Sequence, residues 1–451
     1  MLKLSGPLAS IPGLCLAQPS SVIIERLEQI LPKTIEEWES WISSVQHNRV
    51  ETQVLTSIKR HRINVPRWIN STLENRSSAV KLQNRLRRES FLKLLEALKT
   101  QRIPVILLKG NAISKEIYSD YDYKKMNDVD LLFKRESISK VQQIYNDLGL
   151  KSVASLEKVS QNQNLNSHLW PTYFNQDMSL IIGTHWNLVK SHSKIKIDPL
   201  DLWSRAENIE YEGYSILRLS KEDFIHHLCI QLSPHKVGAK ELADIYNSIS
   251  AWKSFNWHKF HSLVQAAHSF DAVYRALSLS QNLIFLSPIQ LYIDSIRDSV
   301  DISVLNEIEY RSENPEDILL TRTSHIAVIE KYSTLFTLSE YPFEKSYFLL
   351  KIWQLILFPS LVEAAHLNFQ VIPFSKVNQL ICRTKAPLRI LNSIAQDNGW
   401  NIFLGIVFQY HWDLVKSWGV FLFKFKIIGI KQKAQILGID VQQLKTIAAF
   451  D

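Results

Sequence analysis

The fold is decided by residues 103–133, IPVILLKGNAISKEIYSDYDYKKMNDVDLLF. This stretch opens with an apolar run that is too short for a helix, which predicts a buried strand, and it closes with a second run of the same kind. Between the two runs stand a Lys-Gly pair, a segment with helical spacing and a polar loop. The predicted order is strand, turn, helix, loop and strand, over residues 103–108, 109–110, 111–118, 119–127 and 128–133.

The pattern of short strands and helices continues toward the C-terminal side. A helix is predicted over 136–148, where Gly149 ends it. Further strands are predicted over 152–156, 169–174, 178–184 and 214–219. Residues 101–220 are therefore predicted to form one compact α+β module.

Helical sequence flanks this module on both sides. Residues 1–100 are predicted to be an N-terminal helical region, residues 221–270 a helical pair packed on the module, and residues 271–451 a C-terminal helical domain. The segment 313–317, ENPED, is predicted to be a surface loop.

The helix predicted over 77–100 has two kinds of residue. An apolar stripe is predicted from Leu82, Leu86, Phe91, Leu94, Leu95 and Leu98. The other face carries Lys81, Arg85, Arg87, Arg88 and Lys93. We interpret the basic face as solvated, and a surface that contacts phosphates is the alternative.

Composition limits the class of protein. Of 451 residues, 46% are hydrophobic and 21% are charged, which excludes a disordered or collagen-like chain. Only 12 Gly and 15 Pro argue against a many-stranded all-β protein. A net charge of +8 is compatible with polyphosphate or nucleic-acid partners without requiring them. Three cysteines cannot form a disulfide framework, as in proteins of a reducing compartment.

The chain is predicted to be cytoplasmic. Prolines and glycines interrupt the apolar N-terminal segment, which lacks the core of a secretion signal. The apolar stretches 402–412 and 418–430 do not reach the ~20 residues of a spanning helix. Peripheral contact of the basic, aromatic C-terminal segment with a membrane surface is an alternative that we do not favour.

Asp128 and Asp130 are the most informative polar residues. Residues two apart on a strand point to the same face, with Cβ atoms roughly 6.5–7 Å apart. Two such carboxylates repel one another unless they are exposed or bridged by a cation, and Mg²⁺ suits oxygen ligands of this kind. The turn at Lys109 and Gly110 could bring backbone N–H groups, a helix N-terminus and an ammonium to a phosphate.

The chain resembles the uncharacterised nucleotidyltransferase family of the polymerase-β-like nucleotidyltransferase superfamily. The resemblance covers about residues 20–270. It is carried by the segment 103–133 and by three further blocks, NRLRRESFLKLLEAL (84–98), GTHWNLV (183–189) and KEDFIHHLCIQLSPHKVGAKELADIYNSI (221–249). The fold that it implies is a polymerase-β-like module, a small mixed sheet with helices, embedded between helical N- and C-terminal regions.

The resemblance implies an enzyme that transfers a nucleoside monophosphate from an NTP, with ATP the favoured nucleotide, to a hydroxyl acceptor. Two divalent metals, Mg²⁺ or Mn²⁺, would assist and pyrophosphate would leave. Carried over to this sequence, Lys109 and Gly110 would hold the triphosphate, and Asp128 and Asp130 would bind the metals. Lys124 stands where the family usually has an arginine, and it would contact phosphate through its charge alone.

One family position departs from the pattern. The third carboxylate would be expected at residue 183, which is Gly183. Asp177 shares its strand parity but lies about 20 Å away along an extended strand. His185 could act as base or ligand, or be a structural histidine. A catalytically weakened nucleotide-binding or scaffold relative is therefore one alternative function, and a γ-phosphoryl transferase is another.

Two further expectations concern the role of Asp244 and the acceptor. Asp244 matches a family position within a predicted helix, and we interpret it as a buried acid that pins the helical pair onto the module rather than as a metal ligand. The acceptor stays open among RNA, a peptide or protein, and a small molecule.

Overall fold

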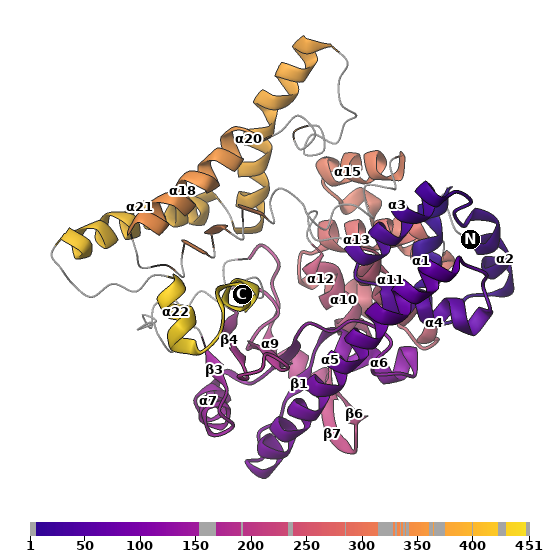
Figure 1. Ribbon diagram of the computed structural model, residues 1–451, viewed down its shortest axis with the longest axis horizontal. Helices are drawn as coiled ribbons and strands as arrows, with labels where there is room; N and C mark the ends of the chain where they lie inside the picture. The colour runs from indigo at the N-terminus through magenta and orange to yellow at the C-terminus, as the bar shows by residue number, and fades with distance from the viewer. Residues whose placement is uncertain are drawn as a thin grey trace. The chain divides into compact units, whose positions relative to one another are not determined.

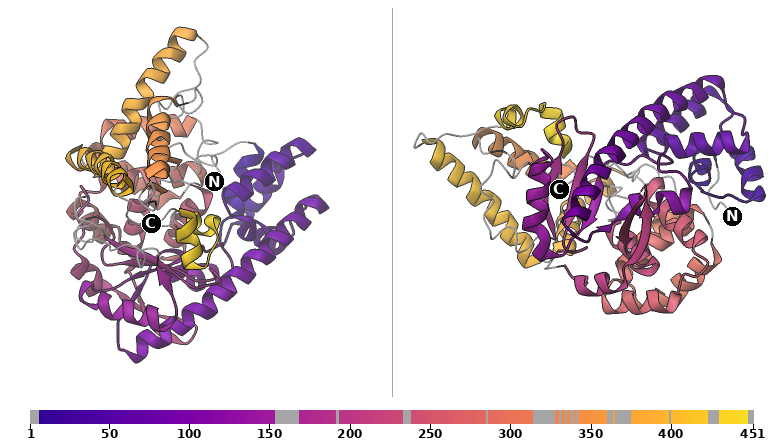
Figure 2. Two further views of the ribbon diagram at one scale, coloured as in Figure 1. Left: turned by 60° about the vertical axis from the view of Figure 1, so that its left-hand side comes forward. Right: turned by 90° about the horizontal axis from the view of Figure 1, so that it is seen from below.

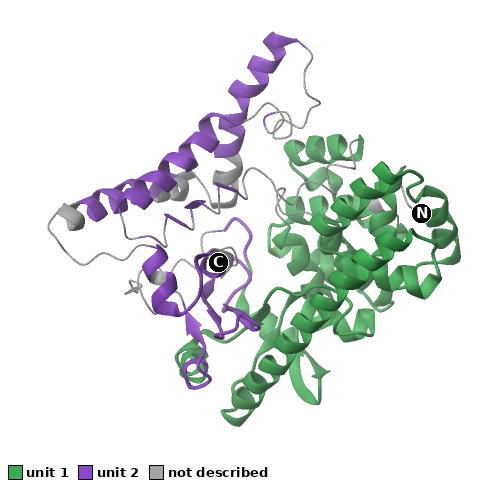
Figure 3. Ribbon diagram, viewed as in Figure 1, with its two compact units in different colours: residues 1–144, 197–322 green, residues 145–196, 323–451 purple. Residues whose placement is uncertain are grey.

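The structure is a computed structural model that describes residues 6–152, 168–190, 193–232, 238–284, 286–313, 342–359, 364, 375–398, 400–422 and 430–447, with seven single or paired positions between 328 and 339. The chain forms two compact units (Figure 3). The first unit comprises residues 1–144 and 197–322, and the second comprises residues 145–196 and 323–451. The boundaries of these units differ from those of the four predicted regions, and the division of the chain into those regions stays a prediction. Each unit is described by itself.

The first unit combines helices with four strands, which confirms the α+β class (Figure 1). Its N-terminal helices are α1 (Ser10–Leu14), α2 (Ser21–Ile30), α3 (Ile35–His47), α4 (Glu51–His61) and α5 (Arg67–Thr100). Then follow β1 (Ile106–Leu107), α6 (Lys109–Tyr118), β2 (Val129–Leu132), α7 (Ile138–Asp147, which ends just beyond the unit), α9 (Pro199–Arg205), β6 (Glu207–Tyr211) and β7 (Tyr214–Arg218). The remaining helices are α10 (Lys221–Gln231), α11 (Ala239–Ala251), α12 (Trp257–Ala266), α13 (Phe270–Leu283), α14 (Ser287–Ile296) and α15 (Ile302–Glu313).

The strands of the first unit form a mixed sheet in the order β2-β1-β7-β6. β1 pairs antiparallel with β2, where Ile106 faces Leu132, and parallel with β7, where Ile106 faces Leu217. β6 and β7 form an antiparallel hairpin. β1 is shorter than the predicted strand 103–108, although the carbonyl of Val105 still accepts from Leu217 N at 3.3 Å.

Two elements of the first unit were missed by the sequence prediction. α9 begins at Pro199 behind the N-cap Asp198, whose side chain accepts from Leu200 N. β6 carries charged residues on an exposed edge and lacks apolar alternation. It turns into β7 at Glu212 and Gly213, both with positive φ, as the two-residue turns of hairpins require.

The N-terminal helices form their own hydrophobic cluster. Trp41 is fully buried on α3, and its indole N–H donates to Ser10 Oγ at 2.8 Å. Leu73 of α5 and Ala239 and Ala243 of α11 belong to the same cluster. The N-terminal helices are thus packed onto α5, whose Phe91 contacts Tyr211 of β6, and onto α11, which packs against α6.

α5 is the long helix that stands out in both views of Figure 2. It begins ten residues earlier than predicted, and its buried face differs from the predicted stripe. Leu82 and Leu86 are exposed, whereas Arg87 is buried and Arg88 is half-buried. The interpretation of a solvated basic face is therefore wrong for these two arginines and right for Lys81, Arg85 and Lys93, which are exposed.

The second unit contains an antiparallel sheet and C-terminal helices. Its strands are β3 (Lys151–Ser152), β4 (Leu169–Phe174) and β5 (Ile181–His185), in the order β3-β4-β5. Its helices are α18 (Pro342–Leu357), α20 (Lys376–Asn398), α21 (Trp400–Leu422), α22 (Ile430–Leu437) and α23 (Val441–Ile447). Phe174 and Ile181 share a core cluster with Phe348 of α18 and Leu437 of α22.

The predicted strands of this unit are found in part. β4 has the predicted bounds, and β5 begins three residues later than expected because a turn occupies residues 175–180. Most of the predicted strand 152–156 and nearly all of the predicted loop 313–317 lie outside the described residues. Among the helices that the structure describes, none combines the length and apolarity needed to cross a bilayer.

The revised buried face of α5 makes a paired prediction. Leu94 is 0% exposed and Leu82 is 59% exposed. Leu94→Ala is expected to cost about 2–5 kcal/mol of unfolding free energy, because it leaves a cavity. Leu82→Ala is expected to cost at most about 0.5 kcal/mol. Urea unfolding of the full chain measures both, and equal losses would contradict the observed orientation of α5.

Candidate active site

The turn from β1 to α6 brings Lys109 against strand β2. The backbone N–H of Leu108 donates to the carbonyl of Asp130 at 3.0 Å, which continues the β1–β2 ladder by one residue. Lys109 then has φ +52 and is the first residue of α6. This left-handed backbone turns the chain sharply from the strand into the helix.

Lys109 lies at a different kind of place from the other non-glycine residues with positive φ. Those residues follow helix ends, as Arg62 and Ser119 do, or lie in strand turns, as Met178 and Glu212 do. A left-handed residue that opens a helix carries about 1–3 kcal/mol of backbone strain. Strain of this kind is concentrated at functional sites, which supports a role for Lys109.

Lys109 forms an ion pair with Asp130. Its Nζ lies 2.8 Å from Asp130 Oδ2, and the side chains are 33% and 6% exposed. Burial alone would lower the pKa of the Lys109 ammonium, but the charges of Asp130 and Asp128 outweigh it and raise that pKa. Lys109 therefore stays charged at the carboxylates.

Asp128 is half-buried two residues before Asp130. Its backbone carbonyl accepts from Asn111 Nδ2 at 3.0 Å, which ties the first turn of α6 to the start of β2. Burial, followed by the charge of Asp130, raises the pKa of Asp128 to about 6, although Lys109, Lys240 and Arg87 act in the opposite direction. Burial of the carboxyl is thus the largest cause of its raised pKa.

The loop before these acids is held by polar residues of α5. The Asn84 side chain donates to the carbonyl of Lys124 at 2.8 Å and accepts from Met126 N at 3.2 Å. Arg87 donates to the carbonyl of Met126 at 2.8 Å. Asn84 was not predicted to have a role, and Arg87 was predicted to be exposed to solvent. Both residues continue the helical spacing of Phe91 and Leu94, and this spacing could have identified them as buried.

Lys124 does not lie free to contact phosphate. Its side chain is 2% exposed, and its Nζ forms an ion pair with Asp244 Oδ2 of α11. A Cβ on Gly110 would stand only 2.6 Å from Lys124 Nζ and 2.8 Å from its Cε. Gly110 therefore serves here to let the Lys124 side chain pass over α6.

Asp244 is the centre of a buried network. It accepts from Tyr118 Oη at 2.6 Å as well as from Lys124. One helical turn later, Asn247 accepts from Ala17 N and donates to the carbonyl of Cys15, both at 3.0 Å. The interpretation of Asp244 as a buried acid that pins the helical pair onto the module is confirmed by these contacts.

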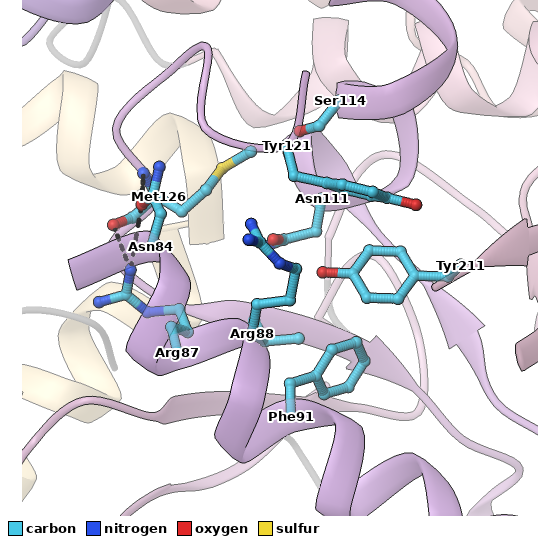
Figure 4. A pocket seen from close by; sticks show the side chains of 10 residues that line it. Asn84, Arg87, Arg88, Phe91, Asn111, Ser114, Tyr121, Met126 and Tyr211 are labelled. Atoms are coloured by element: carbon cyan, nitrogen blue, oxygen red, sulfur yellow. Dashed lines mark hydrogen bonds between the residues drawn. The ribbon is translucent and has the colours of Figure 1, made fainter. Parts of the chain in front are cut away.

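A small polar pocket lies between α5, α6 and the β6–β7 hairpin (Figure 4). Arg88 reaches into it toward Asn111 and Tyr211, and it pairs with Asp122 at 2.9 Å and Glu212 at 3.2 Å. Val129 lines the pocket, and on a strand its side chain points away from the face that its two neighbours share. Neither Asp128 nor Asp130 lines this pocket.

The remaining predicted residues belong to the second unit. His185 is buried at the end of β5, with its ring centroid 5.9 Å from that of His168. Gly183 is half-buried in the same strand, and Asp177 lies in the preceding turn, where it accepts from Ser179 N. The roles predicted for His185 stay predictions. In the part of the chain that the structure describes, no three His, Cys, Asp or Glu side chains gather as a metal site.

Two carboxylates, a lysine and a helix N-terminus at the end of a short strand are the parts expected of a phosphoryl- or nucleotidyl-transferring protein. The sequence model of a family described as "Uncharacterised nucleotidyltransferase" matches residues 35–284, more than half of the chain. The chain belongs to this nucleotidyltransferase family, which confirms the resemblance and implies a nucleotide substrate. Comparison with curated proteins and with solved structures gave no match.

The buried pair of Lys124 and Asp244 makes a testable prediction. Lys124→Met is expected to cost about 3–5 kcal/mol of unfolding free energy, because it leaves the Asp244 carboxylate buried without its cation. Adding Asp244→Asn removes that charge while an amide oxygen still accepts from Tyr118, so the double variant should be more stable than Lys124→Met alone. A double-mutant cycle by urea unfolding measures the coupling, and additive losses would contradict the pair.

The raised pKa of Asp128 predicts a pH dependence of stability. Its folded pKa of about 6 lies above the usual 3.8, so the folded protein holds this proton more tightly than the unfolded chain. The stabilising contribution is complete below about pH 4 and is lost as the pH rises through 6. Asp128→Asn should therefore gain stability relative to wild type across this range. Urea midpoints from pH 4 to 7.5 test this, and a constant difference would refute it.

Proposed function

We propose that the chain transfers a nucleoside monophosphate from an NTP, with ATP the favoured nucleotide, to a hydroxyl acceptor. The acceptor oxygen forms a bond to the α-phosphorus, the bond from that phosphorus to the α,β-bridging oxygen breaks, and pyrophosphate leaves. The hydroxyl proton passes to a base. Membership of the nucleotidyltransferase family supports this reaction class.

The observation that carries the proposal is the placement of Lys109. Its ammonium stands at Asp130, its backbone opens α6, and Asp128 directly precedes the strand that carries Asp130. A helix N-terminus favours phosphate through its N–H groups and its dipole. The β1–α6 turn therefore joins an anion-binding element to a pair of carboxylates.

The carboxylates fit a divalent cation. Asp128 and Asp130 stand two residues apart beside the turn at Lys109, and oxygen donors of this type suit Mg²⁺ or Mn²⁺. Asp128 and Asp130 would hold the cation. The chemistry it supplies when bound is neutralisation of charge on the triphosphate.

The chain's own residues have separate tasks in this proposal. Lys109 and the first N–H groups of α6 bind the phosphates. Asn111 fixes the start of β2 through the carbonyl of Asp128. Lys124 acts through Asp244 on the shape of the loop, since its buried ammonium is already paired. The proposal rests on the first unit alone, and the role of His185 stays a prediction.

A catalytically weakened relative is the second candidate function. It is favoured by Gly183 at the position where the third carboxylate is expected, and by the lack of a third acid, histidine or cysteine grouped with Asp128 and Asp130 among the described residues. Such a protein would bind nucleotide without transferring it. The acceptor stays open among RNA, a peptide or protein, and a small molecule.

Transfer of label tests the proposal. Purified protein with Mg²⁺ or Mn²⁺ receives each NTP labelled at the α- or the γ-phosphate, with RNA, protein and small-molecule extracts supplied separately. We expect α-label on one fraction and its loss in Asp128→Asn/Asp130→Asn, which removes the carboxylate charges. The exposed pair Asp294→Asn/Asp298→Asn gives the same charge change away from the site and should retain transfer.

The other outcomes separate the alternatives. Transfer of γ-label alone would replace the proposal with phosphoryl transfer. Nucleotide binding without transfer of either label would favour the weakened relative, and Gly183→Asp should then be examined for a gain of activity. Transfer that survives loss of both carboxylates would refute the site.

A further inference from the structure

Lys109 forms an ion pair with Asp130, and the proposed function assigns the carboxylate of Asp130 to a metal. Lys109 Nζ is 2.8 Å from Asp130 Oδ2, and the Asp130 side chain is only 6% exposed. A carboxylate buried to this degree is costly without a cation, and Lys109 supplies one. Lys109 thus offsets the charge of one of two neighbouring acids.

We propose that Lys109 and a divalent cation compete for Asp130, and that Lys109 transfers its ammonium from Asp130 to the triphosphate when the cation is bound. This inference rests on the proposed function and adds the order in which the site fills. It makes Lys109 a positioning residue for the carboxylate before it becomes a phosphate ligand.

Competition follows from charge. An ammonium and a divalent cation on one carboxylate repel each other at short range, and the repulsion is large where little water screens it. Arg87 and Lys240 also act on Asp128 by charge, and Lys109 forms an ion pair with Asp130 itself. The exchange therefore concerns the displacement of Lys109 from this carboxylate.

The lysine is also able to move. Its side chain is 33% exposed, and a four-carbon stem allows the ammonium to reorient without movement of the backbone. Its backbone is the first residue of α6, so the new position lies at the helix N-terminus where phosphates are favoured. The exchange needs only a change of side-chain rotamer.

The exchange predicts that metal and nucleotide bind cooperatively. Metal alone must displace Lys109 without compensation, whereas a triphosphate receives the released ammonium. By reciprocity, each ligand should then strengthen the binding of the other.

Mn²⁺ binding without nucleotide tests the inference. Free Mn²⁺ is measured by electron paramagnetic resonance in titrations of the full chain and its variants. Lys109→Met should bind Mn²⁺ about tenfold more tightly than wild type, because no ammonium has to be displaced. Lys109→Arg should stay near wild type, since the guanidinium still pairs with the carboxylate. Lys240→Met, which removes a charge that acts on Asp128 and leaves Lys109 in place, is the control for general electrostatics.

The outcomes are distinguishable. A gain in Lys109→Met no larger than in Lys240→Met would overturn the exchange, because general electrostatics would explain it. If Asp130→Asn leaves Mn²⁺ binding unchanged in every background, the metal site of the proposed function itself fails. Thermal melting with Mn²⁺ checks folding and gives a second readout, since the upward shift in Tm should be larger for Lys109→Met than for wild type.

Discussion

The buried ion pair between Lys124 and Asp244 is the interaction on which the arrangement of the first unit depends. Charges inside a protein are tolerated only when they are paired and hydrogen-bonded, so this pair commits both elements to one position. The loop can follow its course because Gly110 leaves room for the lysine stem and because Asn84 and Arg87 satisfy its backbone. The loop in turn ends at β2, so the position of the carboxylates depends on a buried contact that includes neither of them.

Sequence patterns predicted the elements that carry local periodicity. The first predicted strands, the helix that begins at the Lys-Gly turn and the α+β class were all recognisable within a window of 31 residues. The partners of the loop were not, because they lie about 40 and 120 residues away along the chain. Arg87 was predicted to be exposed because arginine rarely occupies a core position. Strand β6 was not predicted because its charged residues give no alternation of apolar and polar positions.

The candidate site, too, could be predicted from the sequence only in part. Two aspartates with a spacing of two could be found from strand geometry alone, and the Lys-Gly turn could be recognised as an anion-binding element. That Lys109 points at Asp130, and that Lys124 points away from solvent, depends on side-chain packing that no spacing rule describes. The two lysines look equivalent in the sequence and have different surroundings, one half-exposed at the carboxylates and the other enclosed by α6 and α11.

The ties made by α11 also bear on the order of synthesis. Asn247 holds the segment at Cys15 and Ala17, which leaves the ribosome more than 200 residues earlier. At about 5–20 residues per second, that segment waits for about 10–45 s and the Lys124 loop for about 6–24 s before α11 is made. Nascent chains that stop before α11 therefore expose an unpaired lysine and uncovered apolar helices. Chains shortened from the C-terminal side should therefore extend at least to the end of α11.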